Sequence, residues 1–129
     1  MNKIIVEVSI GELLDKISIL EIKKGKIKDP EKLKFVKNEH SILKKQLEIN
    51  VKSDDKLEKY FQALKEINSK LWVIEDDKRE CEKNKDFGEK FIKLSRDVHF
   101  LNDDRAKIKL QINNYTGSVI KEIKEYTSY

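Results

Sequence analysis

The sequence predicts a single all-α domain over residues 1–129, an antiparallel bundle of four main helices with a short N-terminal β-strand. Its 129 residues suit one domain, because a domain usually takes about 100–200 residues. Four glycines and one proline leave too few turn residues for a β-sandwich or barrel. Charged residues make up 40% of the chain, well above the roughly 25% of an average domain. Together with apolar residues at helical spacing, these observations favour long helices joined by short loops.

The N-terminal segment Lys3–Val8 is rich in β-branched residues and predicts a short strand. A lone strand is not stable, so we expect it to pair with the same strand of a second subunit or to lie along the bundle. The first helix is predicted to begin at Ser9, which forms a capping box with Glu12, and to end at Gly25. Its apolar stripe consists of Ile10, Leu13, Leu14, Ile17 and Leu20.

The second helix is predicted to begin at the sequence Asp29-Pro30-Glu31 and to reach about Asn50. An aspartate cap, a proline at the first helical position and an acid in the first turn are typical of a helix start. His40 lies on the apolar stripe of this helix. We interpret it as a hydrogen-bonded structural residue rather than a ligand.

The third and fourth helices are predicted to be the longest. The third is capped by Ser53-Asp54-Asp55 and ends at about Asn84, and the fourth is capped by Asp86 and ends near residues 113–117. Residues 118–126 predict a short fifth helix. Because the connections are short, successive helices are expected to be antiparallel neighbours.

The net charge of +4 is concentrated in one segment. Between Lys23 and Glu48 nine lysines face four acids. This segment is either a pair of solvated helix ends or a docking face for phosphates, nucleic acid or an anionic membrane. Because acids are interleaved with the lysines, we do not expect nucleic acid as a partner.

Several classes of site are excluded by the residue counts. One cysteine and two histidines cannot form a disulfide or a thiolate metal cage, so no metal or other cofactor is expected. The four glycines are isolated from one another, which excludes a glycine-rich phosphate loop. No apolar run of about 20 residues and no leader segment is present, so we expect no membrane span and a cytoplasmic location.

Polar residues interrupt the apolar stripes of three predicted helices. Arg105 falls on the inner face of the fourth helix, Asn68 and Glu75 on or beside that of the third, and Glu21 on that of the first. An unpaired buried charge costs several kcal/mol, roughly, so these groups need partners. We therefore predict that Arg105 bridges Glu21 or Glu75.

Only three of the 28 basic residues are arginines. Arginine forms bidentate contacts with carboxylate or phosphate that lysine cannot form, which makes each arginine a candidate binding residue. The candidate ligand-binding residues combine these arginines with polar neighbours at helical spacing: Asp15, Lys16, Glu21, Glu75, Arg79, Arg96, Asn102, Asp103, Arg105 and Lys109.

Two interpretations of these residues stay open, a buried ion network that fixes helix register and a polar pocket between helices. Our first functional hypothesis is a non-catalytic binding module whose pocket takes an anionic small molecule or a partner segment. The alternative is an all-α, Mg²⁺-dependent nucleotide or phosphoester hydrolase built on the acid pairs Glu12/Asp15 and Glu75/Asp76. Whether the protein is an enzyme therefore stays open. Homodimerisation through the N-terminal strand or an exposed helix face is a further hypothesis.

Four stretches of the chain resemble an uncharacterised family of short helical proteins from bacteria and phages, classed as a domain of unknown function. They are SIGELLDKISILEIK at residues 9–23, LWVIED at 71–76, FIKLSR at 91–96 and NDDRAKIK at 102–109. The resemblance covers nearly the whole chain and includes all three arginines. It departs from the family at His99, where a tyrosine is usual, and in the tail at residues 121–126.

The resemblance implies a context rather than a chemistry. Members of the family occur near glycosyltransferases of surface-polysaccharide synthesis, which suggests a link to that process. No established activity can be transferred from the family to residues of this chain.

Overall fold

The protein is all-helical, as the sequence predicts. The computed structural model describes residues 2–129, and within that range it contains no β-strand. No helix in the described part of the chain is long and apolar enough to span a membrane. The four helices are α1 (Ile10–Lys26), α2 (Pro30–Asn50), α3 (Asp55–Lys83) and α4 (Glu89–Thr116).

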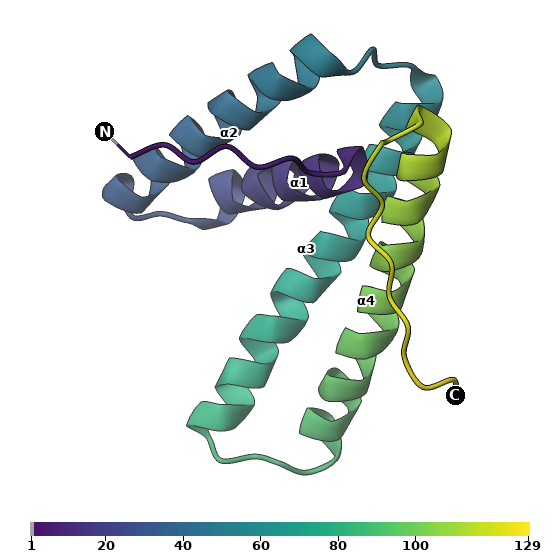
Figure 1. Ribbon diagram of the computed structural model, residues 1–129. Helices are drawn as coiled ribbons and strands as arrows, with labels where there is room; N and C mark the ends of the chain where they lie inside the picture. The colour runs from purple at the N-terminus through teal and green to yellow at the C-terminus, as the bar shows by residue number, and fades with distance from the viewer. Residues whose placement is uncertain (1) are drawn as a thin grey trace.

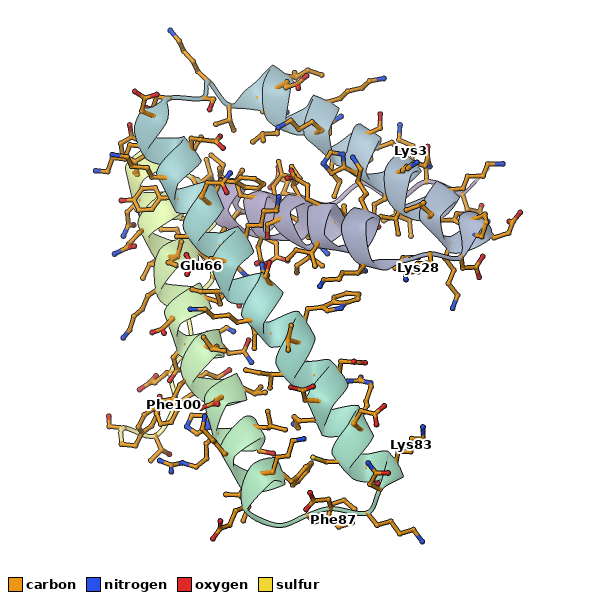
Figure 2. All side chains as sticks on the ribbon, turned by 180° about the vertical axis from the view of Figure 1, so that it is seen from behind. Lys3, Lys28, Glu66, Lys83, Phe87 and Phe100 are labelled. Atoms are coloured by element: carbon orange, nitrogen blue, oxygen red, sulfur yellow. The ribbon has the colours of Figure 1, made fainter. Side chains whose placement is uncertain are left out.

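The four helices pack as two hairpins that cross. α1 packs against each of the other three helices, and α3 also packs against α4. The α1–α2 hairpin lies across one end of the longer α3–α4 hairpin, whose far half extends away from the crossing (Figure 1). Lys28 marks the turn of the first hairpin and Phe87 the tip of the second (Figure 2). The main hydrophobic core lies at the crossing and contains Leu14, Ile17, Leu57, Phe61, Leu64 and Ile112.

Local capping contacts set the helix starts. The side chains of Ser9, Asp29 and Asp54 accept hydrogen bonds from backbone amides in the first turns of α1, α2 and α3 at 3.0, 3.0 and 2.8 Å. These contacts confirm the three predicted caps. The predicted cap of α4 is wrong, because the Asp86 side chain accepts from the Gly88 amide at 3.1 Å and closes the preceding turn instead. α4 therefore begins after Gly88.

The predicted N-terminal strand is not formed. Residues 3–8 are extended, but no β-ladder partner lies beside them in the described part of the chain. Ile4 and Val6 are 88% and 69% exposed. A β-branched run favours extended backbone, but only a neighbouring strand turns that backbone into a sheet.

The predicted fifth helix over residues 118–126 is also wrong. Gly117 adopts the left-handed conformation with φ 68°, which ends α4. The Ser118 amide then donates to the Asn113 carbonyl at 2.9 Å. From there the chain runs extended along α4 to the C-terminus (Figure 1).

Candidate functional site

A close approach of α1 to α4 positions the polar residues at the helix crossing. The Gly11 amide donates to Asn113 Oδ1 at 2.7 Å. A β-carbon at residue 11 would lie only 2.6 Å from the Lys109 carbonyl oxygen. The two helices can therefore approach this closely only with glycine at this point.

Lys109 is the centre of a buried ion cluster beside this contact. Its side chain is 7% exposed, and Nζ donates to Glu12 Oε2 at 2.6 Å and to Glu122 Oε2 at 2.7 Å. Asp15 Oδ2 lies 3.9 Å from the same nitrogen. The cluster thus joins α4, the first turn of α1 and the C-terminal tail.

The pKa values of Lys109 and Glu122 both shift toward the charged forms. Burial by itself lowers the pKa of the Lys109 ammonium, but the hydrogen bonds to Glu12 and Glu122 and the nearby Asp15 charge raise it above its ordinary value. The hydrogen bond from Lys109 lowers the pKa of the Glu122 carboxyl against a smaller effect of burial. Both groups are therefore charged at neutral pH.

Asn68 connects this buried cluster to an arginine at the edge of the core. Its Nδ2 donates to Asp15 Oδ1 and to Ser18 Oγ, both at 2.8 Å. The Ser18 hydroxyl donates in turn to the Asp15 carbonyl at 2.7 Å. Asn68 Oδ1 accepts from Arg105 Nη1 at 3.2 Å. Both the nitrogen and the oxygen of the Asn68 side-chain amide therefore form hydrogen bonds.

Arg105 borders a pocket of about 370 Å³ where α1, α3 and α4 meet. Opposite it, Arg79 Nη1 lies 3.2 Å from Glu75 Oε2, one turn earlier on the same helix. The pocket therefore combines two guanidinium groups, two carboxylates and one large aromatic ring. Its lining consists of Ile19, Asn68, Leu71, Trp72, Glu75, Asp76, Arg79 and Arg105.

The predicted ion pairs of Arg105 are not formed. Within residues 2–129 no carboxylate lies within 4.0 Å of its guanidinium. Glu75 pairs with Arg79, while Glu21 lies 3.2 Å from Lys65 and 3.4 Å from His40. Glu21 thus contacts α2 and α3 and is not part of the pocket lining. The half-buried Arg105 is left with one hydrogen bond, to an uncharged amide.

The structure brings some of the predicted site residues together and separates others. Glu75, Arg79 and Arg105 line one pocket, and Asp15 and Lys109 form the buried cluster behind it.

The remaining four predicted residues lie elsewhere. Lys16 is exposed, and Asn102 is half-buried. Arg96 is exposed and lies 5.8 Å from the ring centre of Phe100. The Asp103 carboxylate accepts a hydrogen bond from the Tyr129 hydroxyl. Lys16 therefore lies on the surface of α1, whereas Arg96, Asn102 and Asp103 lie on α4, with Asp103 at the contact between α4 and the tail.

The candidate ligand-binding residues did not include Trp72 or Asp76, although both line the pocket. Asp76 was considered only in the acid pair of the alternative hydrolase. Trp72 lies on the flank of the apolar stripe, one turn before Glu75 and Asp76 on the same helix. One feature of the sequence could have indicated that Trp72 lines the site: it is the single tryptophan of the chain and lies close to inward-facing charges.

A larger hollow of about 660 Å³ lies on another surface of α3 and α4. It is open and mainly apolar, with Val73, Ile74, Phe100 and Leu101 among its lining residues. We place the candidate site in the smaller pocket because only that pocket joins opposed arginines and carboxylates from different helices.

The acid pairs considered for a metal site are divided between two environments. Glu12 and Asp15 both face the Lys109 ammonium, and Glu75 and Asp76 lie in the pocket with two arginines. Among residues 2–129 no group of three or more histidine, cysteine, aspartate or glutamate side chains is arranged to hold a metal ion.

Comparison with known proteins identifies the chain at family level. A family model described as a family of unknown function (DUF6165) matches residues 4–129. No curated protein and no solved structure matches the chain significantly.

Proposed function

The chain belongs to the DUF6165 family of unknown function, and from the geometry of its pocket we propose that it is a non-catalytic binding module for an anionic small molecule. The observation that carries the proposal is the state of Arg105. A half-buried guanidinium normally pairs with a carboxylate, since desolvating an unpaired charge is unfavourable. Here the neighbouring acid, Glu75, pairs with Arg79 instead.

Arg105 keeps most of its donors for a ligand. A guanidinium carries five N–H donors, and one hydrogen bond, to Asn68, is formed within the described chain. Asp15 and Ser18 hold the Asn68 side chain, and Asn68 in turn holds the Arg105 guanidinium in place before a ligand arrives. Such preorganisation reduces the entropy lost on binding.

The other lining residues favour a ligand that carries both a phosphate and a hydroxylated ring. Arg79 is 74% exposed in its pair with Glu75, and an exposed pair one turn apart is weak enough to exchange for a phosphate. The Trp72 ring offers an apolar face for a sugar or base. The carboxylates of Glu75 and Asp76 can accept hydrogen bonds from sugar hydroxyls. Together with the proposed link to surface-polysaccharide synthesis, this chemistry makes nucleotide sugars and sugar phosphates the first ligands to test.

The test is a thermal-shift panel followed by calorimetric titration of any hit. The panel holds nucleotides, nucleotide sugars, sugar phosphates and inorganic phosphate. A ligand at a hundred times its dissociation constant adds about 2.7 kcal/mol, which raises the melting temperature by several degrees. We expect at least one phosphorylated compound to do so.

Two arginine variants decide whether the pocket is responsible. Arg105→Gln should abolish the shift, whereas Arg96→Gln should preserve it, because Arg96 lies outside the pocket on the surface of α4. Without ligand, Arg105→Gln should melt at the same or a higher temperature, since it removes an unpaired charge. A hit that survives in Arg105→Gln, or a flat panel, would contradict the proposal.

A phosphate-release assay on the nucleotides of the same panel tests the hydrolase alternative. Phosphate release from a nucleotide in the presence of Mg²⁺, lost in Glu75→Gln, would replace the binding module by an enzyme. We expect no release, because the pocket acids lie beside two guanidinium groups that compete with a metal ion for them.

A further inference from the structure

α2 carries a second apolar stripe on the side facing away from the rest of the molecule. Phe35, Ile42 and Ile49 recur at intervals of seven residues and therefore form a straight line along the helix. They are 72%, 53% and 76% exposed. Three large apolar side chains in line are unusual on the solvent face of a helix.

The fold itself does not use this stripe. The core-facing side of α2 is formed by Val36, Leu43 and Leu47. At about 3.6 residues per turn, these residues lie roughly 120° around the helix from the exposed stripe. α2 forms an edge of the molecule in both views, with no other helix on its outer side (Figures 1 and 2).

We propose that two copies of the chain associate through these outer faces of α2, with the two helices antiparallel. A two-fold axis at Ile42 would place Phe35 of each copy beside Ile49 of the other, and the two Ile42 side chains together. The stripe is then self-complementary, as an isologous interface requires.

The charges beside the stripe favour a second copy of the chain as the partner and an antiparallel arrangement of the two α2 helices. Lys34 and Glu48 each precede a stripe residue and so lie on the same flank of the helix. In an antiparallel pair, Lys34 of one copy meets Glu48 of the other, and the symmetry forms this ion pair twice. In a parallel pair, Lys34 and Glu48 would lie 14 residues apart along the helices, roughly 21 Å at 1.5 Å per residue, and this ion pair could not form. On the other flank, Glu39 of one copy meets Gln46 of the other, which permits a hydrogen bond.

The same charges disfavour an anionic membrane as the partner. Lys34 and Lys45 also border the stripe, so the face carries charges of both signs. Acidic lipid headgroups would attract these lysines but repel Glu31 and Glu39, whereas the antiparallel pair brings opposite charges together. The contact between two single helices is small, at the lower end of the interface sizes seen for transient complexes. We therefore expect a dimer that forms in the micromolar range and depends on concentration.

Sedimentation velocity over a concentration series tests the proposal directly. Ile42→Lys should keep the protein monomeric, because it places two ammonium groups together on the two-fold axis. Ile92→Lys is the matched control, since Ile92 is 55% exposed but lies on α4. It should dimerise as the wild type does. Helical circular dichroism should be unchanged in both variants, because neither residue is buried.

Charge exchange gives a second, independent test. Lys34→Glu and Glu48→Lys should each weaken the dimer by about threefold to tenfold, because each replaces two attractive pairs by two repulsive ones. The double variant should restore wild-type affinity.

Three results would overturn the proposal: a wild-type protein that stays monomeric at millimolar concentration, equal loss of dimer in Ile92→Lys, or failure of the double variant to recover. Monomeric wild type that binds phosphatidylserine vesicles through Phe35 and Ile42 would assign the face to a membrane instead. Ligand binding at Arg105 is measured separately in Ile42→Lys, so this proposal and the proposed function can fail independently.

Discussion

At the scale of single residues, Asn68 determines how the polar interior is satisfied. Its amide donates to Asp15 and Ser18 and accepts from Arg105, so three helices meet at one side chain. The helical spacing predicts that Asn68 lies on the inner face of α3. It does not predict the partners, because these depend on how α1 and α4 are turned toward it.

Asn68→Ala should lower the free energy of unfolding by about 2–4 kcal/mol, because it leaves two buried acceptors without a donor. Urea denaturation measures this change. Asn102→Ala is the matched control: Asn102 is half-buried on α4 and makes no side-chain hydrogen bond within residues 2–129. We expect it to change the stability by less than about 0.5 kcal/mol. A small effect at Asn68 would show that water replaces the amide without loss.

At the scale of helices, Gly11 determines how closely α1 packs on α4. Gly11→Ala should destabilise the protein by about 1–3 kcal/mol, because the new methyl group meets the Lys109 carbonyl of a neighbouring helix. Gly25→Ala in the same helix should stabilise it by up to about 1 kcal/mol, because no atom lies within 4 Å of its added methyl group. Thermal melts of the two variants give the comparison. Equal stabilisation by both changes would contradict the close approach of α1 to α4.

At the scale of the whole molecule, the Lys109 cluster fastens the C-terminal tail to α4. The pKa of Glu122 is lowered from 4.5 in the docked state, so its contribution is complete above pH 4.5 and is lost as the pH falls through the lowered value. The pKa of Lys109 is raised from 10.5, so its contribution is complete below pH 10.5 and is lost as the pH rises through the raised value. The tail should therefore be fastened across the neutral range and released in acid.

Backbone ¹⁵N relaxation of residues 119–126 at pH 7 and pH 3 measures the release. We expect the tail to be ordered at pH 7 and mobile at pH 3 in the wild type. In Glu122→Gln it should be mobile at both pH values, and in Glu125→Gln, an exposed neighbour, it should behave as in the wild type. A tail that stays ordered in Glu122→Gln at pH 7 would show that apolar contacts, rather than the ion cluster, hold it.

The features that the sequence predicts correctly are those that depend on near neighbours in the chain. The four helices follow from apolar spacing, and the caps at Ser9, Asp29 and Asp54 follow from contacts within one helical turn. Most of the incorrect predictions need a distant partner; the cap at Asp86 is the local exception, because its side chain accepts from the Gly88 amide instead. The strand over residues 3–8 lacks a second strand, and residues 118–126 are extended beside α4, where Glu122 reaches Lys109.

The helices can be read from the spacing of apolar residues alone, and this spacing also made Arg105, Glu75 and Arg79 candidate site residues. Three features follow from the packing of the helices and not from the sequence pattern: Arg105 faces a pocket without a carboxylate partner, Trp72 lines the same pocket, and α2 turns an apolar stripe outward. The physical reason is that helix formation and amphipathicity are set by residues a turn apart. The pairing of charges between helices depends on the crossing of the two hairpins, and this crossing is fixed by packing at a few contacts, such as that of Gly11 with α4.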